Sequence, residues 1–225
     1  AIIYRISLES QYQEEAYIKA IDSLNIEIKN STYPLKPVLH SITANVYWNY
    51  YQQNRWKFYN RTETKGFENN DIRTWDLKKL LKETIYHHHQ ALASTDSLQR
   101  TLIDNFEPIL IVEQKETRRL RPTLYDFLAH RAVDFFSNSE SSITEPSYAF
   151  EVDNADYFKS GEDFQELAIE TKDSLSLNFY ALKGLQELTK FHLRDSLPTA
   201  LVDVELKRLA FVRRIAVMEE KDSLY

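Results

Sequence analysis

The sequence predicts an all-α fold of stacked antiparallel helix hairpins, tetratricopeptide-like, with long irregular loops. Three observations lead to this prediction. Only 3 of the 225 residues are glycine, where average usage gives roughly 16. Tight turns between strands and phosphate-binding loops both require glycine, so its scarcity favours helices. Apolar residues recur at helical spacing along most of the chain, and short polar breaks that contain proline separate these segments.

The periodic segments predict six helices, at residues 14–29, 37–59, 76–93, 122–136, 174–194 and 199–218. Pro122 is expected in the first turn of the fourth helix. The short break at Ser196-Leu197-Pro198 predicts that the last two helices pair antiparallel. A further short helix is expected within 96–105. The β-branched stretch 109–112 is typical of a strand, although no partner strand is evident.

We expect one helical domain over residues 1–225. The polar stretch 137–160 is either a long surface excursion or a join between two subdomains. The chain opens on helix-like apolar residues without an initiator Met. It ends where Asp222 is expected to cap a new helix. Both features suggest a segment of a longer polypeptide.

Composition narrows the function. The net charge of −6 weighs against nucleic acid as the main partner. The absence of cysteine excludes disulfides, thiolate metal sites and cysteine nucleophiles. No apolar run approaches the roughly 18 residues that span a bilayer. No catalytic motif is recognisable. We therefore expect a non-enzymatic protein-binding module with no cofactor, no metal and no membrane span.

The run His87-His88-His89 is the most conspicuous local feature. Consecutive helical residues point about 100° apart, so three adjacent imidazoles do not converge on one metal. Metal-binding helices place histidines at i and i+4, and no such pair occurs here. Packed or surface histidines are the favoured interpretation. Metal binding and pH sensing remain alternatives.

Aromatic residues are dense between positions 47 and 59. They are expected to fill the space between neighbouring helices. Alternatively, Trp48, Tyr51 and Trp56 form a surface platform that stacks on a sugar. A basic cluster follows later in the chain, at Lys115, Arg118, Arg119 and Arg121. It either pairs with surface carboxylates or docks an acidic partner.

The triplet Asp-Ser-Leu occurs five times, with its serines at positions 23, 97, 174, 196 and 223. Chance gives roughly 0.12 occurrences for this composition. One interpretation is helix capping, which fits the triplets at 96, 173 and 222 and fails at Asp22 in mid-helix. The other is O-glycosylation, because the triplet is similar to an Asp-Ser/Thr-apolar acceptor in exported proteins of some Gram-negative bacteria. Ser196, Ser97 and Ser174 are then the candidate acceptors.

Four strings carry a family resemblance: Ala44–Trp56, Ile72–Lys79, Leu120–Ala132 and Glu170–Leu177. They resemble the N-terminal helical region of large bacterial alpha-2-macroglobulin-like envelope proteins. The resemblance implies a periplasmic or outer-membrane location and later domains that trap proteases. The family's Cys-x-Glu-Gln thioester is not found here, because Ile111 stands at the cysteine position before Glu113-Gln114.

Two functions follow as hypotheses. The first is a non-catalytic helical scaffold or interaction module of such a protease-trap protein, whose partner is another domain of the long chain or an envelope protein. The second is a carbohydrate-binding helical protein of the cell surface. The exposure of the tryptophans discriminates between them.

Overall fold

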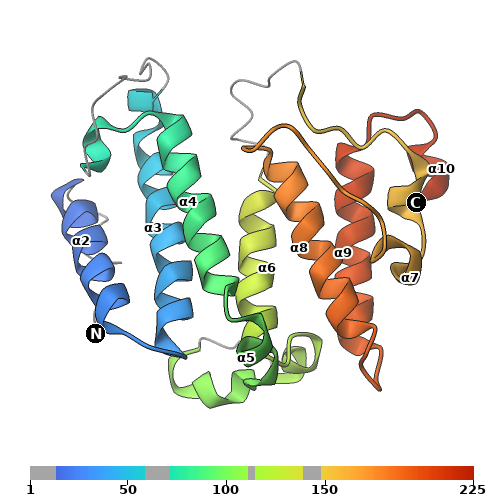
Figure 1. Cartoon of the computed structure of the whole chain (residues 1–225), viewed down its shortest axis with the longest axis horizontal. Helices are drawn as coiled ribbons and strands as arrows, with labels where there is room; N and C mark the ends of the chain where they lie inside the picture. The colour runs from blue at the N-terminus through green and yellow to red at the C-terminus, as the bar shows by residue number, and fades with distance from the viewer. Residues whose placement is uncertain (1–13, 59–70, 111–114, 139–147) are drawn as a thin grey trace. The chain divides into compact units, whose positions relative to one another are not determined.

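The computed structural model describes residues 14–58, 71–110, 115–138 and 148–225. These residues form an all-α fold without strands, as the sequence predicts, and contain two isolated β-bridges (Figure 1). The α-helices are α2 (Glu14–Asn30), α3 (Leu35–Phe58), α4 (Leu77–Leu92), α5 (Thr95–Arg100), α6 (Leu124–Phe136), α7 (Gly161–Phe164), α8 (Leu177–His192), α9 (Thr199–Ile215) and α10 (Lys221–Leu224). The 3₁₀ helices are η1 (Ile72–Thr74), η2 (Ile103–Ile109), η3 (Lys115–Leu120) and η5 (Ala155–Phe158).

The chain divides into two compact units, residues 1–94 and 95–225, and each is described by itself. The first unit contains α2, α3 and α4. The second contains α5 to α10. The described residues of the stretch 137–160, where the sequence suggested a join, belong to the second unit.

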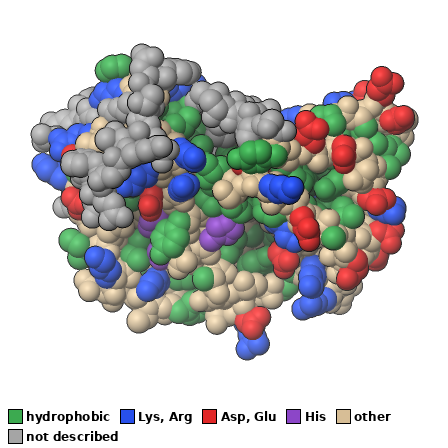
Figure 2. Space-filling model, turned by 45° about the horizontal axis from the view of Figure 1, so that its top comes forward, with side chains coloured by type: hydrophobic (Ala, Val, Ile, Leu, Met, Phe, Trp, Pro, Cys, Tyr) green, Lys and Arg blue, Asp and Glu red, His purple; other side chains and the backbone are tan. Residues whose placement is uncertain are grey.

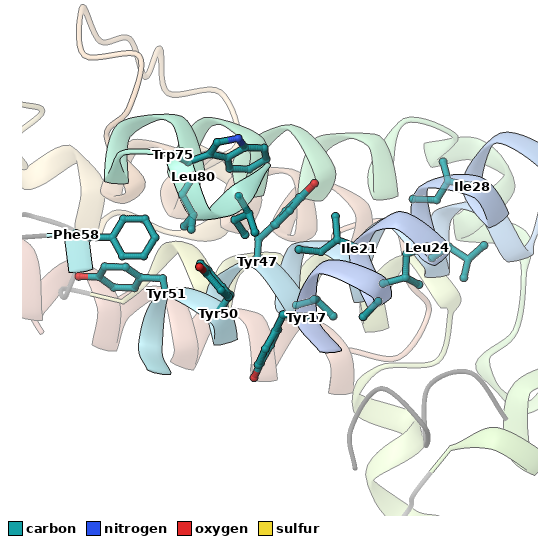
Figure 3. Packing of buried hydrophobic residues seen from close by; sticks show 14 residues of the cluster. Tyr17, Ile21, Leu24, Ile28, Tyr47, Tyr50, Tyr51, Phe58, Trp75 and Leu80 are labelled. Carbon is teal, nitrogen blue, oxygen red and sulfur yellow. The ribbon is translucent and has the colours of Figure 1, made fainter. Parts of the chain in front are cut away.

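In the first unit, α3 packs against both α2 and α4. Tyr17 and Leu24 on α2 meet Tyr47 and Tyr50 on α3, and Trp75 closes the cluster just before α4 (Figure 3). Tyr17 and Tyr50 meet edge to face with ring centroids 5.7 Å apart, a favoured geometry for aromatic pairs. This core explains why α3 is rich in tyrosine: large rings fill the space on both of its packed sides.

Helix α3 changes direction near its end. Asn54 departs from helical geometry, at φ −118° and ψ 20°, and its side-chain amide donates to the carbonyl of Tyr50 at 2.9 Å. A short polar side chain that binds the preceding turn competes with the backbone ladder. The kink therefore has a local cause in the sequence.

In the second unit, α8 packs against α6 on one side and α9 on the other. The predicted packing of the last two helices is thereby confirmed. Gln186 of α8 anchors the irregular region around α7, because its side-chain amide donates to the carbonyls of Phe164 and Leu167 at 2.9 and 2.8 Å. The tetratricopeptide-like repeat remains a prediction.

The helix boundaries correct three expectations. Pro122 lies before α6 rather than in its first turn, because Thr123 is the N-cap and forms a capping box with Asp126. Helix α8 begins later than predicted, because Ser176 caps it through the backbone N–H of Phe179. Ile109 ends the 3₁₀ helix η2 instead of opening a strand. Residues 111 and 112 of that expected strand lie outside the described residues.

Gly184 allows α8 to approach α6 closely. A Cβ at this position would lie 2.8 Å from Cγ2 of Val133 on α6. Valine is stiff at χ1 in a helix, so this methyl group cannot easily turn away. Overpacking of this kind typically costs about 1–3 kcal/mol, while alanine gains only about 1 kcal/mol of helix propensity over glycine.

We predict that Gly184→Ala lowers the free energy of unfolding by about 1 kcal/mol, because the clash outweighs the propensity gain. In a Val133→Ala background, where the clashing methyl is gone, the same change should instead raise it. Urea unfolding of the four proteins measures both effects. A stabilising Gly184→Ala in the wild-type background would contradict the close approach.

Candidate functional site

His192, in the last turn of α8, joins three segments of the second unit. Its Nε2 lies 2.8 Å from Oδ1 of Asp126, and its Nδ1 lies 2.7 Å from Oδ2 of Asp195. Asp126 is fully buried and His192 is 1% exposed. The second oxygen of Asp126 accepts from the N–H and the hydroxyl of Thr123, both at 2.8 Å. The start of α6, the end of α8 and the following turn therefore meet at one imidazole.

This arrangement determines the charge of His192. A carboxylate only accepts hydrogen bonds, so both ring nitrogens must donate, and only the imidazolium does so. Burial alone lowers the pKa of His192. The hydrogen bonds and negative charges of Asp126 and Asp195 together outweigh burial and raise it above the usual value of 6.5. The folded chain thus holds a buried cation between two carboxylates.

A second histidine of α6 has the opposite character. His130 is 1% exposed, and its Nδ1 accepts from Lys207 of α9 at 3.3 Å. Burial lowers its pKa to about 2, and the positive charges of Arg121, Lys207 and His192 act in the same direction. His130 is therefore neutral while the neighbouring His192 is charged.

Arg208 of α9 is a second buried cation in this unit, at 1% exposure. Its guanidinium donates to the carbonyls of Tyr157 and Lys159 at 2.7 and 2.8 Å, and to the carboxylate of Glu205. Glu205 also accepts from the hydroxyl of Thr189 on α8, at 2.9 Å. These bonds attach η5, whose Tyr157 is itself buried, to the α8–α9 pair.

In both clusters the polar atoms already have partners within the protein. The polar side-chain atoms of Asp126, His192 and Arg208 bind backbone or side-chain groups, and these three residues are buried. The geometry suits conformational fixation rather than the handling of a substrate. Among the described residues, no three His, Asp or Glu side chains are placed to hold one metal ion.

The histidine run separates as helical geometry requires. His87 and His88 are buried and His89 is exposed. The Nδ1 of His87 lies 3.0 Å from the Nδ1 of His40 on α3, so one ring donates and the other accepts. Burial lowers the pKa of both imidazoles. The pKa of His87 falls to about 4, because the nearby ring of His40 lowers it as well. Between pH 6.5 and about 4, His40 and His87 bind protons in the unfolded chain but stay neutral in the folded chain. Acid therefore destabilises the first unit.

The aromatic region divides in a similar way. Tyr51 is 2% exposed and stacks on the half-buried Trp48 with ring centroids 4.8 Å apart. Trp56 is 69% exposed. The three side chains therefore do not form one surface platform, because Tyr51 is part of the core. Trp56 is the most exposed of the three, and Nζ of Lys57 lies over its ring, 5.3 Å from the centroid.

The basic cluster before α6 pairs largely within the unit. Arg118 contacts Asp104 at 2.7 Å and Glu107 at 3.4 Å, and Arg121 contacts Asp203 of α9 at 3.4 Å. Pairing with carboxylates, the first of the two interpretations, is confirmed for these two arginines. The side chain of Lys115 lies outside what the structure describes.

The Asp-Ser-Leu triplets occupy different environments. In the triplet at 195–197 all three residues are exposed, Leu197 at 71%. Ser97 is exposed on α5 and Ser174 in the turn before α8. Ser23 is half-buried within α2.

Helix capping explains the triplets less well than expected. Asp173 accepts from Leu175 N–H at 3.0 Å, but Ser176 caps the helix that follows. Asp222 lies inside α10 and pairs with Arg213 at 2.8 Å. Pro198, and not Ser196, is the N-cap of α9. Asp96 and Asp222 stand in the first turns of α5 and α10, where a negative charge suits the helix dipole, but neither is the N-cap.

Sequence reasoning missed both buried cations. Two local signals were present: the capping-box spacing Thr123-x-x-Asp126, and His192-x-x-Asp195 at a helix end. Neither predicts that the two meet, because 66 residues separate Asp126 from His192.

No family model, curated protein or solved structure matches the chain. Within the described ranges, no helix is both long and apolar enough to cross a membrane. The site's interpretation therefore rests on its own geometry.

We predict that His192→Gln destabilises the protein by about 3 kcal/mol at pH 6, because it leaves the buried Asp126 without its cation. The raised pKa means that the stability from His192 is fully present below pH 6.5 and is lost as the pH rises through the folded pKa. The gap between wild type and variant should therefore narrow in alkali. Urea unfolding from pH 6 to 9.5 measures this gap.

Asp195→Asn is the graded control for this experiment. It removes one of the two carboxylates that raise the pKa of His192, so the loss of stability, which begins near pH 6.5 in both proteins, should be complete at a lower pH than in wild type. A gap between wild type and His192→Gln that stays constant or widens above pH 6.5 would contradict a charged His192.

Proposed function

We propose that this chain is a non-catalytic helical interaction module of a macroglobulin-like, protease-trap type protein of the cell envelope. It acts as a rigid scaffold for other domains of the same polypeptide or for an envelope partner. The observation that carries the proposal is the use of the buried polar groups. His192, Asp126 and Arg208 all fix helices and irregular segments against one another.

The four strings that resemble the macroglobulin-like family support the proposal in a specific way. Each contains a helix start or a core segment. Ala44–Trp56 includes buried tyrosines of α3, and Ile72–Lys79 includes the N-cap Asp76 of α4. Leu120–Ala132 includes the capping box of α6, and Glu170–Leu177 includes the N-cap of α8. Residues of these kinds specify a fold, which suits a scaffold role.

Fractionation of the native host tests this proposal. An antibody raised against residues 148–225 should detect a polypeptide much larger than 26.6 kDa, in the periplasmic or outer-membrane fraction. The antibody's signal must disappear in a strain that lacks the gene. A band of about 27 kDa in the cytosolic fraction would overturn the proposal.

A carbohydrate-binding function is the second candidate, and one observation favours it. Trp56 is 69% exposed near the end of α3, and Gln53 and Asn49 are exposed about one and two turns before it. An indole face beside amide side chains suits the apolar and hydroxyl surfaces of a sugar ring. Because Tyr51 is buried, this alternative now depends on Trp56.

An envelope location also makes O-glycosylation of the Asp-Ser-Leu triplets a coherent proposal. Ser196 is the best acceptor, because the whole triplet lies exposed in the turn between α8 and α9. Ser97 and Ser174 are exposed but lie in more ordered surroundings: Ser97 is helical, and the carbonyl of Ser174 accepts from Tyr180 Oη at 2.9 Å. A glycan on the turn adds bulk and solubility without entering the core.

We expect protein purified from the native host to carry added hexose mass, and Ser196→Ala to remove at least part of it. Intact-mass spectrometry measures the shift, and Ser23→Ala is the matched control, since Ser23 is half-buried in a helix. Five unmodified serines would refute the glycosylation proposal.

A further inference from the structure

One exposed face of α4 carries two lysines. Lys78 and Lys82 are exposed at positions i and i+4, and Tyr86, at 51%, and His89 are exposed on the same face. At a rise of 1.5 Å per residue these side chains extend over about 16 Å of the helix axis. Burial lowers the pKa of the His89 imidazole, so the positive charge of this face comes from the lysines. Figure 2 shows Lys and Arg side chains spread over the surface in this view.

Lysines stand at the start of α4, after its N-cap Asp76. Lys78 and Lys79 lie in the first turn, and Lys82 follows one turn later. Lys79 packs over the ring of Trp75, with its Nζ 4.9 Å from the ring centroid. Lys78 and Lys82 have no such aromatic contact among the described residues.

Within the described part of the chain, Lys78 and Lys82 do not have a carboxylate partner as other cations of the chain do. In the second unit, Lys159, Lys207 and Arg213 each contact a carboxylate at 2.9 Å or less. Lys78 and Lys82 form no such ion pair with any carboxylate of the described residues. Their charges are available to an external anion.

The charge distribution indicates what kind of anion. Residues 1–94 contain 12 Lys and Arg against 10 Asp and Glu, a net charge of +2, while residues 95–225 contain 16 against 24, a net charge of −8. A unit of charge +2 on a chain of charge −6 is too weakly basic to hold a polyphosphate backbone over many contacts. One helix face with a central tyrosine suits an acidic protein segment, because tyrosine is a frequent anchor in protein interfaces.

We propose that the face of α4 formed by Lys78, Lys82, Tyr86 and His89 docks an acidic amphipathic segment of a partner protein. The lysines meet its carboxylates and Tyr86 meets its apolar side. This inference deepens the proposed interaction module and rests on it.

The test uses a fluorescein-labelled, 16-residue helical peptide with glutamate on one face and leucine on the other. A scrambled peptide of the same composition and a single-stranded DNA of equal charge are the comparison probes. Fluorescence anisotropy at low salt should show binding of the helical peptide to the whole chain. The Lys78→Glu/Lys82→Glu variant should weaken that binding about tenfold.

Lys19→Glu/Lys29→Glu is the matched control, because it makes the same change of charge on exposed positions of α2. It should leave the affinity within about twofold of wild type. Equal losses in both variants, equal binding of the scrambled peptide, tighter binding of the DNA, or no binding of the helical peptide would each overturn the proposed surface. None of these results bears on the size and location of the native protein, which test the proposed function separately.

Discussion

The second unit is organised around one charge, that of the imidazolium of His192. A buried carboxylate is stable only when it is paired, and Asp126 is fully buried. His192 supplies that pairing from another helix, and Asp195 binds the opposite nitrogen at 2.7 Å. The packing of α8 against α6 and the path of the turn into α9 both depend on this proton.

Arg208 is the second buried cation, and it binds the irregular segment around η5. This segment buries Tyr157 and Phe164, and its buried backbone carbonyls also require donors. The guanidinium provides them from within α9, while Glu205 and Thr189 hold it in place. Arg208 therefore binds polar backbone beside the apolar core of the unit, to which Tyr157 and Phe164 belong. Fixed contacts of this kind suit a scaffold.

The sequence predicts the helices well, but it does not predict the buried polar contacts of His192 and Arg208, and the reason is physical. Helix periodicity is local, so the core faces of α2 and α8 can be recognised within one segment. Contacts such as His192 to Asp126 join residues 66 positions apart, and no local spacing encodes them. Tyr51 shows the same limit, since only the fold reveals that it is buried while Trp56 is exposed. Likewise, the lysines of α4 become a surface only once α4 has packed its apolar side.

The protonation state of His192 tests this account most directly. In a ¹⁵N-labelled sample, the two ring nitrogens of His192 should both carry protons at pH 6 and give the chemical shifts of an imidazolium. His130 in the same spectrum should show one protonated and one bare nitrogen, because its pKa is lowered to about 2. A neutral His192 at pH 6, with one bare nitrogen facing a carboxylate, would contradict the central claim.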